Sequence, residues 1–344
     1  MRTKKWIFFA GMLLFTAGLL RFPAAAVSGV VRGLRMCGGA LIPALFPYFV
    51  LTRLVICYAS FGRMGRLAEK PMRFLFGVEG NCFPALLLSF LGGYPTGAGS
   101  VVSLYENGRI SKESAQRALA FCNNSGPAFF LGVAGGIVLK SQRAGFVLYL
   151  IHCLSAVTAG VLLAAPPAPH ITVRKVPPQE ESVPFSRAFL DAIGGSCAAL
   201  LQIGSLVLFF SVLTELLDSS GVFALLSAFP AARGFLCGVL ELSSGILQLS
   251  GSWNTRFLLC AFLLGWGGVC VHFQAASLWT PAGLRPRGYL PEKALHGILS
   301  VFFAAAYLHF SLFSLVAALM LPTAVFLFAY IRKKRTGNLL RAVI

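Results

Sequence analysis

Long apolar stretches without charge constrain this chain more than any other feature. The windows Ile7–Leu20, Ala144–Ala165 and Gly297–Tyr330 contain no Asp, Glu, Lys or Arg. A helix needs about 20 such residues to cross ~30 Å of hydrocarbon. Only 12% of all residues are charged, against about a quarter in soluble domains. The sequence therefore predicts an all-α polytopic membrane protein, and the solid apolar runs exclude the alternating strands of a porin-type barrel.

Basic residues gather at both ends of the chain. The stretch MRTKKW precedes the first span and YIRKKRTGN follows the last. Because Lys and Arg favour the cytoplasmic side, both termini are expected in the cytoplasm, with an even number of crossings. This placement accounts for the net charge of +18, so a lipid bilayer is the expected partner and nucleic acid is not. The basic start followed by PAAA also fits a cleaved signal peptide, but we expect an uncleaved first span.

One Pro-rich, charged stretch, PPAPHITVRKVPPQEESVP, lacks any apolar period and is typical of a linker. Basic residues from Arg63 to Arg73, and the stretch PAGLRPRGYLPEK, are expected to be polar loops. A long helix is expected over Phe185–Leu217, and Ser111 or Ser114 as the cap of a short amphipathic helix. The expected divisions are a membrane anchor in residues 1–31, a first half in 32–165, the linker in 166–187, a second half with C-terminal spans in 188–331, and a basic cytoplasmic tail in 332–344.

The apolar segment SFLGGYPTGAGSV, residues 89–101, is interrupted by glycines and a proline. Pro removes a backbone donor and Gly makes the backbone permissive, so this segment is expected to break. Each unpaired backbone group in hydrocarbon costs several kcal/mol. Non-helical backbone at that depth therefore persists only where protein covers it or water reaches it. We interpret the break as a site for a polar or anionic group.

Matching interruptions occur in the two halves. FLGGYPTGA and FCNNSGPAFF lie in the first half, and VLELSSGIL and GWGGVCVHFQA in the second. Interrupted segments at corresponding places predict internal repeats, with a substrate site where the breaks meet. An alternative is that the glycines serve only helix packing, because Gly93 with Gly97 and Gly132 with Gly136 form small-xxx-small pairs.

Polar side chains near the interruptions favour a site over simple packing. Asn123 and Asn124 lie in an apolar run, where two adjacent amides do not face lipid cheaply. Glu241 is isolated in CGVLELSSGIL, and an acidic group at membrane depth usually faces a cavity, a partner or a proton path. Its alternative is a solvated surface position. His272 and Gln274 raise the same question, although a lone His is more often a packing residue than a ligand.

Catalytic and metal-binding patterns are missing from the sequence. It contains no P-loop, no HExxH and no GxGxxG after a strand. The nine cysteines form no CxxC pair, which argues against a zinc site or a disulfide framework. We expect neither an enzyme nor a bound cofactor or metal.

The stretch FLGGYPTGAGSVVSLYENGRISKESAQRALAFCNNSGPAFFLGV resembles the YlbJ-type sporulation integral membrane proteins of the nucleoside-recognition, or Gate, domain group. GGVCVHFQ and LELSSGI resemble elements of the same family in the second half. The resemblance extends from about Arg32 to Leu327. It implies two pseudo-repeated halves with interrupted or re-entrant helices, similar to the concentrative nucleoside transporters.

The resemblance also implies a function in spore formation: a transporter or channel for a small polar or anionic solute, with dipicolinic acid as the favoured solute. It implies a multi-pass protein of the mother-cell or outer forespore membrane, and leaves a homo-oligomer open. A nucleoside-type transporter and a non-transporting envelope scaffold are the alternatives. The substrate-binding residues carried over by motif are Gly93, Tyr94, Pro95, Thr96, Gly97, Asn123, Asn124, Pro127, Glu241, His272 and Gln274.

Overall fold

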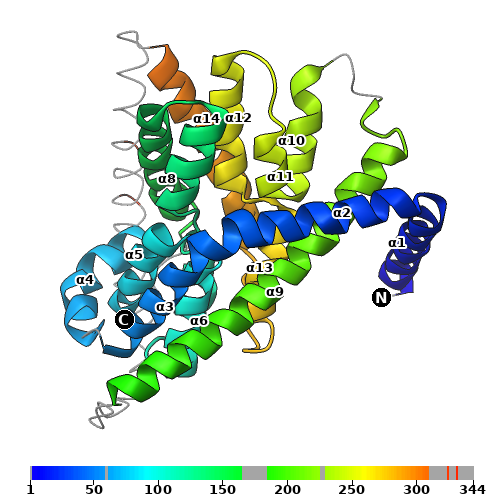
Figure 1. Ribbon diagram of the computed structural model, residues 1–344. Coiled ribbons are helices and arrows are strands. Elements are labelled where there is room, and N and C mark those ends of the chain that lie inside the picture. Colours follow the sequence, from blue (N-terminus) through cyan, green and yellow to red (C-terminus); the bar gives the residue numbers. More distant parts are fainter. Residues whose placement is uncertain are drawn as a thin grey trace.

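The computed structural model describes residues 2–58, 61–164, 184–224, 229–309, 324 and 331. Every regular element in these ranges is helical (Figure 1). The tail 332–344, most of the linker and most of the last apolar run lie outside the described residues.

Before the linker the elements are α1 (Arg2–Arg21), α2 (Pro23–Met36), η1 (Cys37–Leu41), α3 (Ile42–Tyr58), α4 (Phe61–Leu75), η2 (Gly80–Cys82), α5 (Phe83–Gly92), α6 (Thr96–Glu106), α7 (Lys112–Phe121), η3 (Phe129–Val138) and α8 (Gln142–Leu162). After it come α9 (Phe185–Ser219), α10 (Pro230–Leu240), α11 (Leu242–Leu247), α12 (Trp253–Trp266), α13 (Gly268–Trp279) and α14 (Tyr289–Leu308).

Several of these helices have the length and composition to cross a bilayer. Among the described residues they are Gln142–Leu162, Phe185–Ser219 and Trp253–Trp279, and counting two sharply bent pairs raises the number to five. Large apolar side chains are exposed on the outer helices: Leu20 is 79% exposed and Leu201 is 75% exposed. Lipid tails are the environment that such side chains require. The chain is an all-α multi-pass membrane protein, as the sequence predicts.

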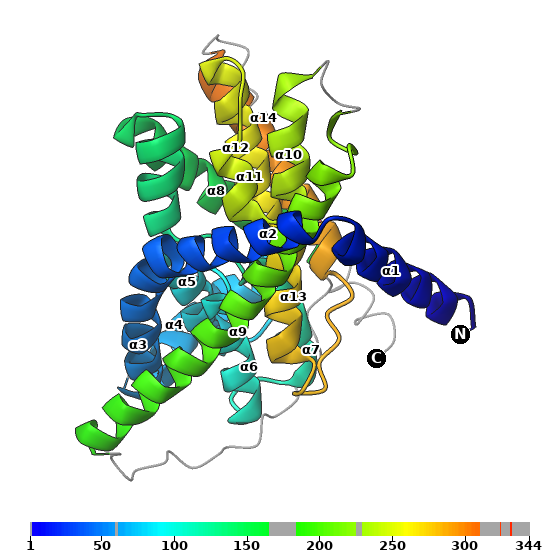
Figure 2. The same cartoon turned by 45° about the vertical axis from the view of Figure 1, so that its right-hand side comes forward.

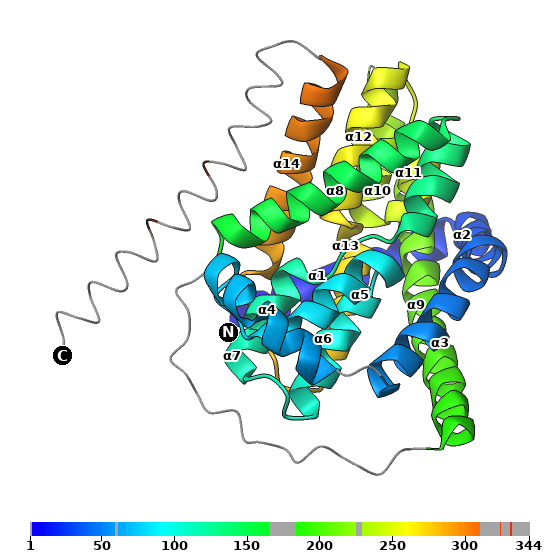
Figure 3. The same cartoon turned by 90° about the vertical axis from the view of Figure 1, so that its left-hand side faces the viewer.

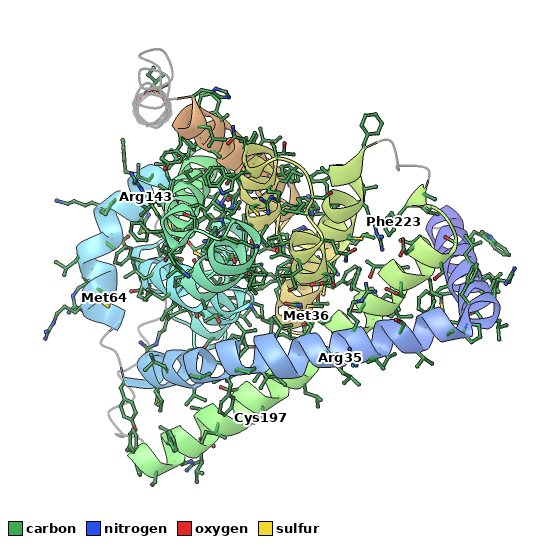
Figure 4. All side chains as sticks on the ribbon, turned by 45° about the horizontal axis from the view of Figure 1, so that its top comes forward. Arg35, Met36, Met64, Arg143, Cys197 and Phe223 are labelled. Atoms are coloured by element: carbon green, nitrogen blue, oxygen red, sulfur yellow. The ribbon has the colours of Figure 1, made fainter. Side chains whose placement is uncertain are left out.

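Helices α2 and α9 cross and pack against each other on one face of the molecule (Figures 1 and 4). Their contact is built on glycine. A Cβ added to Gly29 would lie 2.7 Å from the Cα of Val212, and one added to Gly33 would lie 3.2 Å from the Cα of Leu208. Small residues at this four-residue spacing let two backbones approach closely in lipid. The boundary expected between residues 31 and 32 falls inside α2.

The described residues form three hydrophobic cores: a small one joins η1, α3, α9 and α13, and each of the two larger ones contains residues from both halves. The first of the larger cores is formed mainly by α4, α5, α6 and α7, and takes Ala275 from α13. The second is formed by η3, α8, α11, α12 and α14, and takes Tyr94 from the first half. Figures 2 and 3 show these groups at opposite ends of the molecule. The chain therefore passes from one core to the other between α7 and η3, and again between α12 and α13.

Two segments expected as loops are helical. The basic stretch from Arg63 lies in α4, where the buried Ala68 and Met72 follow a helical period and turn the charged residues outward. The loop was expected because of the basic residues in this stretch, and the helical period of its apolar residues was not considered. The end of PAGLRPRGYLPEK likewise forms the first turn of α14, in which Pro291 is tolerated.

Two local predictions are confirmed. The long helix α9 begins at Phe185 and ends at Ser219, two residues beyond the expected end. Ser111 is the N-cap of α7, and its side chain accepts a hydrogen bond from the backbone N–H of Ser114.

The packing role of glycine differs between two of the predicted glycine pairs, and this generates a test. A Cβ added to Gly97 would lie 1.7 Å from the carbonyl oxygen of Cys122, whereas one added to Gly132 has no atom within 4 Å. We expect Gly97→Ala to lower stability by about 1–3 kcal/mol through overpacking. Gly132→Ala is the matched control and should be neutral or stabilising by up to about 1 kcal/mol. Thermal unfolding of both variants in detergent checks this, and equal midpoints would contradict the close contact.

Candidate functional site

The helices break at the four places where the sequence predicts interruptions. The first break, residues 93–95, separates α5 from α6, and the second, residues 122–126, separates α7 from the helix that leads into η3. The third is at Glu241, between α10 and α11, and the fourth is at Gly267, between α12 and α13. In each half, two packed helices joined at a break (α5 with α6, α10 with α11) are followed by a helix that breaks on its way between the cores. This repetition agrees with the predicted pseudo-repeat.

The four breaks lie against one another. A Cβ added to Gly93 would lie 2.8 Å from the backbone nitrogen of Gly126, which joins the first break to the second. One added to Gly267 would lie 3.0 Å from the hydroxyl of Tyr94, and one added to Gly268 would lie 3.1 Å from the backbone nitrogen at the start of α11. The fourth break thus adjoins the first and the third. The predicted meeting of the breaks is present in the structure.

Residues of the first break position this junction. The backbone of Gly93 has φ = 75°, a conformation that favours glycine, and the Tyr94–Pro95 peptide is cis. Tyr94 is 8% exposed, and its hydroxyl donates a hydrogen bond of 3.0 Å to the carbonyl oxygen of Leu264 on α12. At the second break, Pro127 is the first helical residue, a place where its missing N–H costs nothing.

Glu241 is buried, and its carboxylate caps a helix. The residue is 2% exposed, so the alternative of a solvated surface position is wrong. Its two carboxylate oxygens accept hydrogen bonds from the backbone nitrogens of Ser243 (3.0 Å) and Ser244 (2.7 Å), at the start of α11. The two donors stabilise the carboxylate. A role for Glu241 in a proton path stays a prediction.

The Asn pair lies at the second break and contacts the opposite half. Both residues are fully buried. The Asn123 side-chain amide donates to the hydroxyl of Tyr289 at 2.8 Å, and that hydroxyl lies 3.2 Å from Nδ1 of His272. The Asn124 amide donates to Ser89 Oγ at 2.9 Å. These contacts connect α5, the second break, α13 and α14.

A buried ammonium completes this cluster, and sequence reasoning missed it. Lys293 is fully buried, and its Nζ donates to the carbonyl oxygen of Asn123 at 2.7 Å. Nζ also lies 3.4 Å from Oδ1 of Asn124 and 3.3 Å from Nδ1 of His296. Behind it, the Ser125 backbone N–H donates to Nε2 of His152. One signal was present in the sequence: Lys293 and His296 are three residues apart, which places them on one face of a helix.

A cavity of about 350 Å³ opens beside the first break. Helices α3, α6, α9 and α13 contribute to its walls, and Pro95, Thr96 and Gln274 are the site residues that line it. Asn123, Asn124, Glu241 and His272 are not among its lining residues in this conformation. The predicted site is therefore divided into an open part at the cavity and a buried part at the junction of the breaks.

The cavity wall is apolar with a few polar groups. The side chains of Arg53, Gln202, Ser100, Ser103 and Ser277 line it. The acidic side chain of Asp191 also lines it, and is paired with Arg187 at 4.0 Å. Among the described residues, no group of three His, Cys, Asp or Glu is arranged to hold a metal ion. The apolar wall with a few polar groups is of the kind that binds a small polar solute.

Comparison with known proteins gives a match over most of the chain. No family model matches it, and no solved structure does so. Sporulation integral membrane protein YlbJ of Bacillus subtilis (strain 168) is 24% identical over 324 residues, covering 85% of this chain and 79% of that protein. The match agrees with the resemblance carried by the motifs: over most of its length, this multi-pass membrane protein is similar to a sporulation integral membrane protein.

Proposed function

We propose that the protein is a transporter or channel for a small anionic solute during spore formation, with dipicolinate as the favoured solute. The observation that carries the proposal is the cavity beside the first break, which combines an arginine with hydroxyl and amide groups. Its volume of about 350 Å³ lies within the range of about 300–1,000 Å³ that is usual for small-molecule sites. The role in spore formation rests on the matched relative, which is a sporulation integral membrane protein.

Arg53 gives the cavity its preference for an anion. Its guanidinium lines the cavity from α3 and packs over Gly195 of α9, where an added Cβ would lie 2.5 Å from Nη1. A planar guanidinium binds carboxylates in a bidentate manner. The hydroxyl of Ser103 on α6 and the amide of Gln274 on α13 offer further donors. A flat dicarboxylate fits such a wall, since apolar side chains would cover its ring.

Solute movement follows from the way the halves are joined. Pro95 lines the cavity and belongs to the first break, Thr96 lines it from the start of α6, and the first break lies against the second and fourth. A change in angle at these breaks would therefore move the cavity wall relative to the second core. In this mechanism the solute enters beside α6, and the two cores rearrange around it. The buried Asn pair would then become accessible to the solute.

Uptake into sealed vesicles containing the purified protein tests the proposal. Vesicles with the parent protein should accumulate labelled dipicolinate, and Arg53→Gln should reduce the rate by at least about tenfold, the worth of one charge-assisted contact of 1.4 kcal/mol or more. Arg143→Gln is the matched control, because Arg143 is exposed at the start of α8, outside the cavity lining. No uptake by the parent would favour a scaffold. Uptake of nucleosides with dipicolinate ignored would favour the nucleoside alternative.

The Asn pair generates a second prediction. Replacing both Asn123 and Asn124 by Leu removes the amide donors to Tyr289 and Ser89 and any contact with solute. We expect the double variant to insert into the membrane and to lose uptake. Membrane content measured by immunoblot and uptake measured in the same vesicles check this. Normal uptake would show that Asn123 and Asn124 contribute to packing and have no part in transport.

Glu241 generates a third prediction. In Glu241→Gln one oxygen remains to accept a backbone N–H, and the second N–H is left without an acceptor. We therefore expect a loss of about 1–3 kcal/mol in stability, measured by thermal unfolding in detergent. Glu106→Gln, at an exposed position at the end of α6, is the control and should leave stability unchanged. Equal unfolding midpoints for Glu241→Gln and the parent would contradict the role of this carboxylate as a helix cap.

A further inference from the structure

Lys293 is a buried cation without a carboxylate partner in the described part of the chain. The residue has no exposed surface, and no described ion pair includes it. Taking an ammonium out of water costs several kcal/mol unless its environment compensates. Its compensation comes from three acceptors: the Asn123 carbonyl, Oδ1 of Asn124 and Nδ1 of His296. Because the desolvation of this ammonium is unfavourable, we looked for a function that requires a charge at this position.

The hydrogen-bond directions identify the charged form. Nε2 of His296 lies 3.1 Å from the carbonyl oxygen of His152. Since a carbonyl only accepts, Nε2 carries the hydrogen and Nδ1 is free to accept from Lys293. The Asn124 amide nitrogen is already bonded to Ser89 and Phe121, so its oxygen faces Nζ. An ammonium has three hydrogens for three acceptors, whereas a neutral amine would oppose one acceptor with a lone pair.

The ammonium occupies a position where transporters hold a coupling cation. It lies at the carboxyl end of α7, where the broken helix leaves carbonyl groups unpaired. Carbonyls at such breaks and at half-helix carboxyl ends coordinate Na⁺ or accept H⁺ in transporters with broken helices. Here α14 of the second half supplies the cation to the second break, which belongs to the first half. Removing the charge would weaken this contact between the two halves.

We propose that the Lys293 ammonium is a built-in cation that locks the second break to α14, and that loss of its proton unlocks the two halves. In the unlocking step the N–H bond breaks, its electron pair stays on Nζ, and the proton passes to a water molecule that enters the break. Binding of a proton reverses the step. Low pH therefore favours the locked state, and high pH favours the open state.

The titratable groups around Lys293 come from α14 itself and from elements packed against it. Tyr289, Glu292 and His296 lie on α14 itself. Glu292 is 1% exposed, and both of its oxygens are without a hydrogen-bond partner in the described structure. The groups from neighbouring elements are Cys122 at the end of α7, His152 on α8 and, through Tyr289, His272 on α13. None of them accepts a hydrogen bond from Nζ except His296.

Use of the lock to drive solute rests on the transport function proposed above, whereas the lock itself does not. In a transporting protein, a resident ammonium takes the place of a metal ion. Uptake should therefore respond to a proton gradient and should be unchanged when potassium replaces sodium. The first experiment measures the lock without any solute, so that failure of the lock and failure of transport are separable.

Alkylation of Cys122 by N-ethylmaleimide measures opening of the second break. Cys122 is fully buried at that break, and Cys260, fully buried within α12, is the reference in the same molecule. Peptide mass spectrometry gives the ratio of their alkylation rates in purified full-length protein as the pH is raised. The reference removes the common effect of thiol ionisation. In the parent we expect the ratio to rise by about tenfold per pH unit, the slope for release of one proton.

Two variants identify Lys293 as the group that titrates. In Lys293→Met the ratio should be high at every pH and should no longer depend on pH. In His296→Leu, which removes one of the three acceptors, the rise should begin at lower pH; this variant decides the matter if Lys293→Met does not fold. A merely local charge effect has the opposite sign, because a nearby ammonium favours the reactive thiolate and its removal would slow alkylation of Cys122. A slower Cys122 in Lys293→Met, or one pH profile shared by parent and His296→Leu, would overturn the lock.

Discussion

Backbone hydrogen bonding inside a bilayer is the constraint on which this structure depends. Each helix break frees N–H and C=O groups that hydrocarbon does not satisfy. At three of the four breaks a side chain supplies a missing partner: Lys293 and His152 at the second, Glu241 at the third, and Tyr94 beside the fourth. At the second and fourth breaks these partners come from other elements. The groups that satisfy the backbone at the breaks therefore also hold the two halves together. Loss of one of these hydrogen bonds would affect the contact between the halves.

The arrangement separates recognition from control. The cavity with Arg53 and Gln274 lies on the side of α3, α6, α9 and α13, and it offers the contacts for a solute. The cluster around Lys293 lies behind the first break and has no exposed surface. Pro95 and Thr96 belong to the cavity, while Gly93, two residues earlier, lies against the second break. The chain thus connects solute binding to the buried cluster over a few residues.

The sequence predicts the fold class, the breaks and the burial of Glu241, because each depends on local composition. Gly and Pro within apolar runs identify the breaks, and charge-free windows identify the spans. The partners of the breaks escape such reasoning: Lys293 and Asn123 are 170 residues apart in sequence, and a Lys at the start of an apolar run usually indicates the membrane interface. The helix α4 was not predicted because its many basic residues are typical of a polar loop, although Ala68 and Met72 follow a helical period. Arg53 was missed because only tertiary packing places it at the cavity.

The dipicolinate content of spores tests the central claim most directly. In a strain of the source organism that lacks this protein, the account predicts that dipicolinate is still made in the mother cell, while the spore core contains little of it and the spores lose heat resistance. Supplying the parent gene should restore both properties. Spores with normal dipicolinate content and normal heat resistance in the absence of the protein would contradict the account.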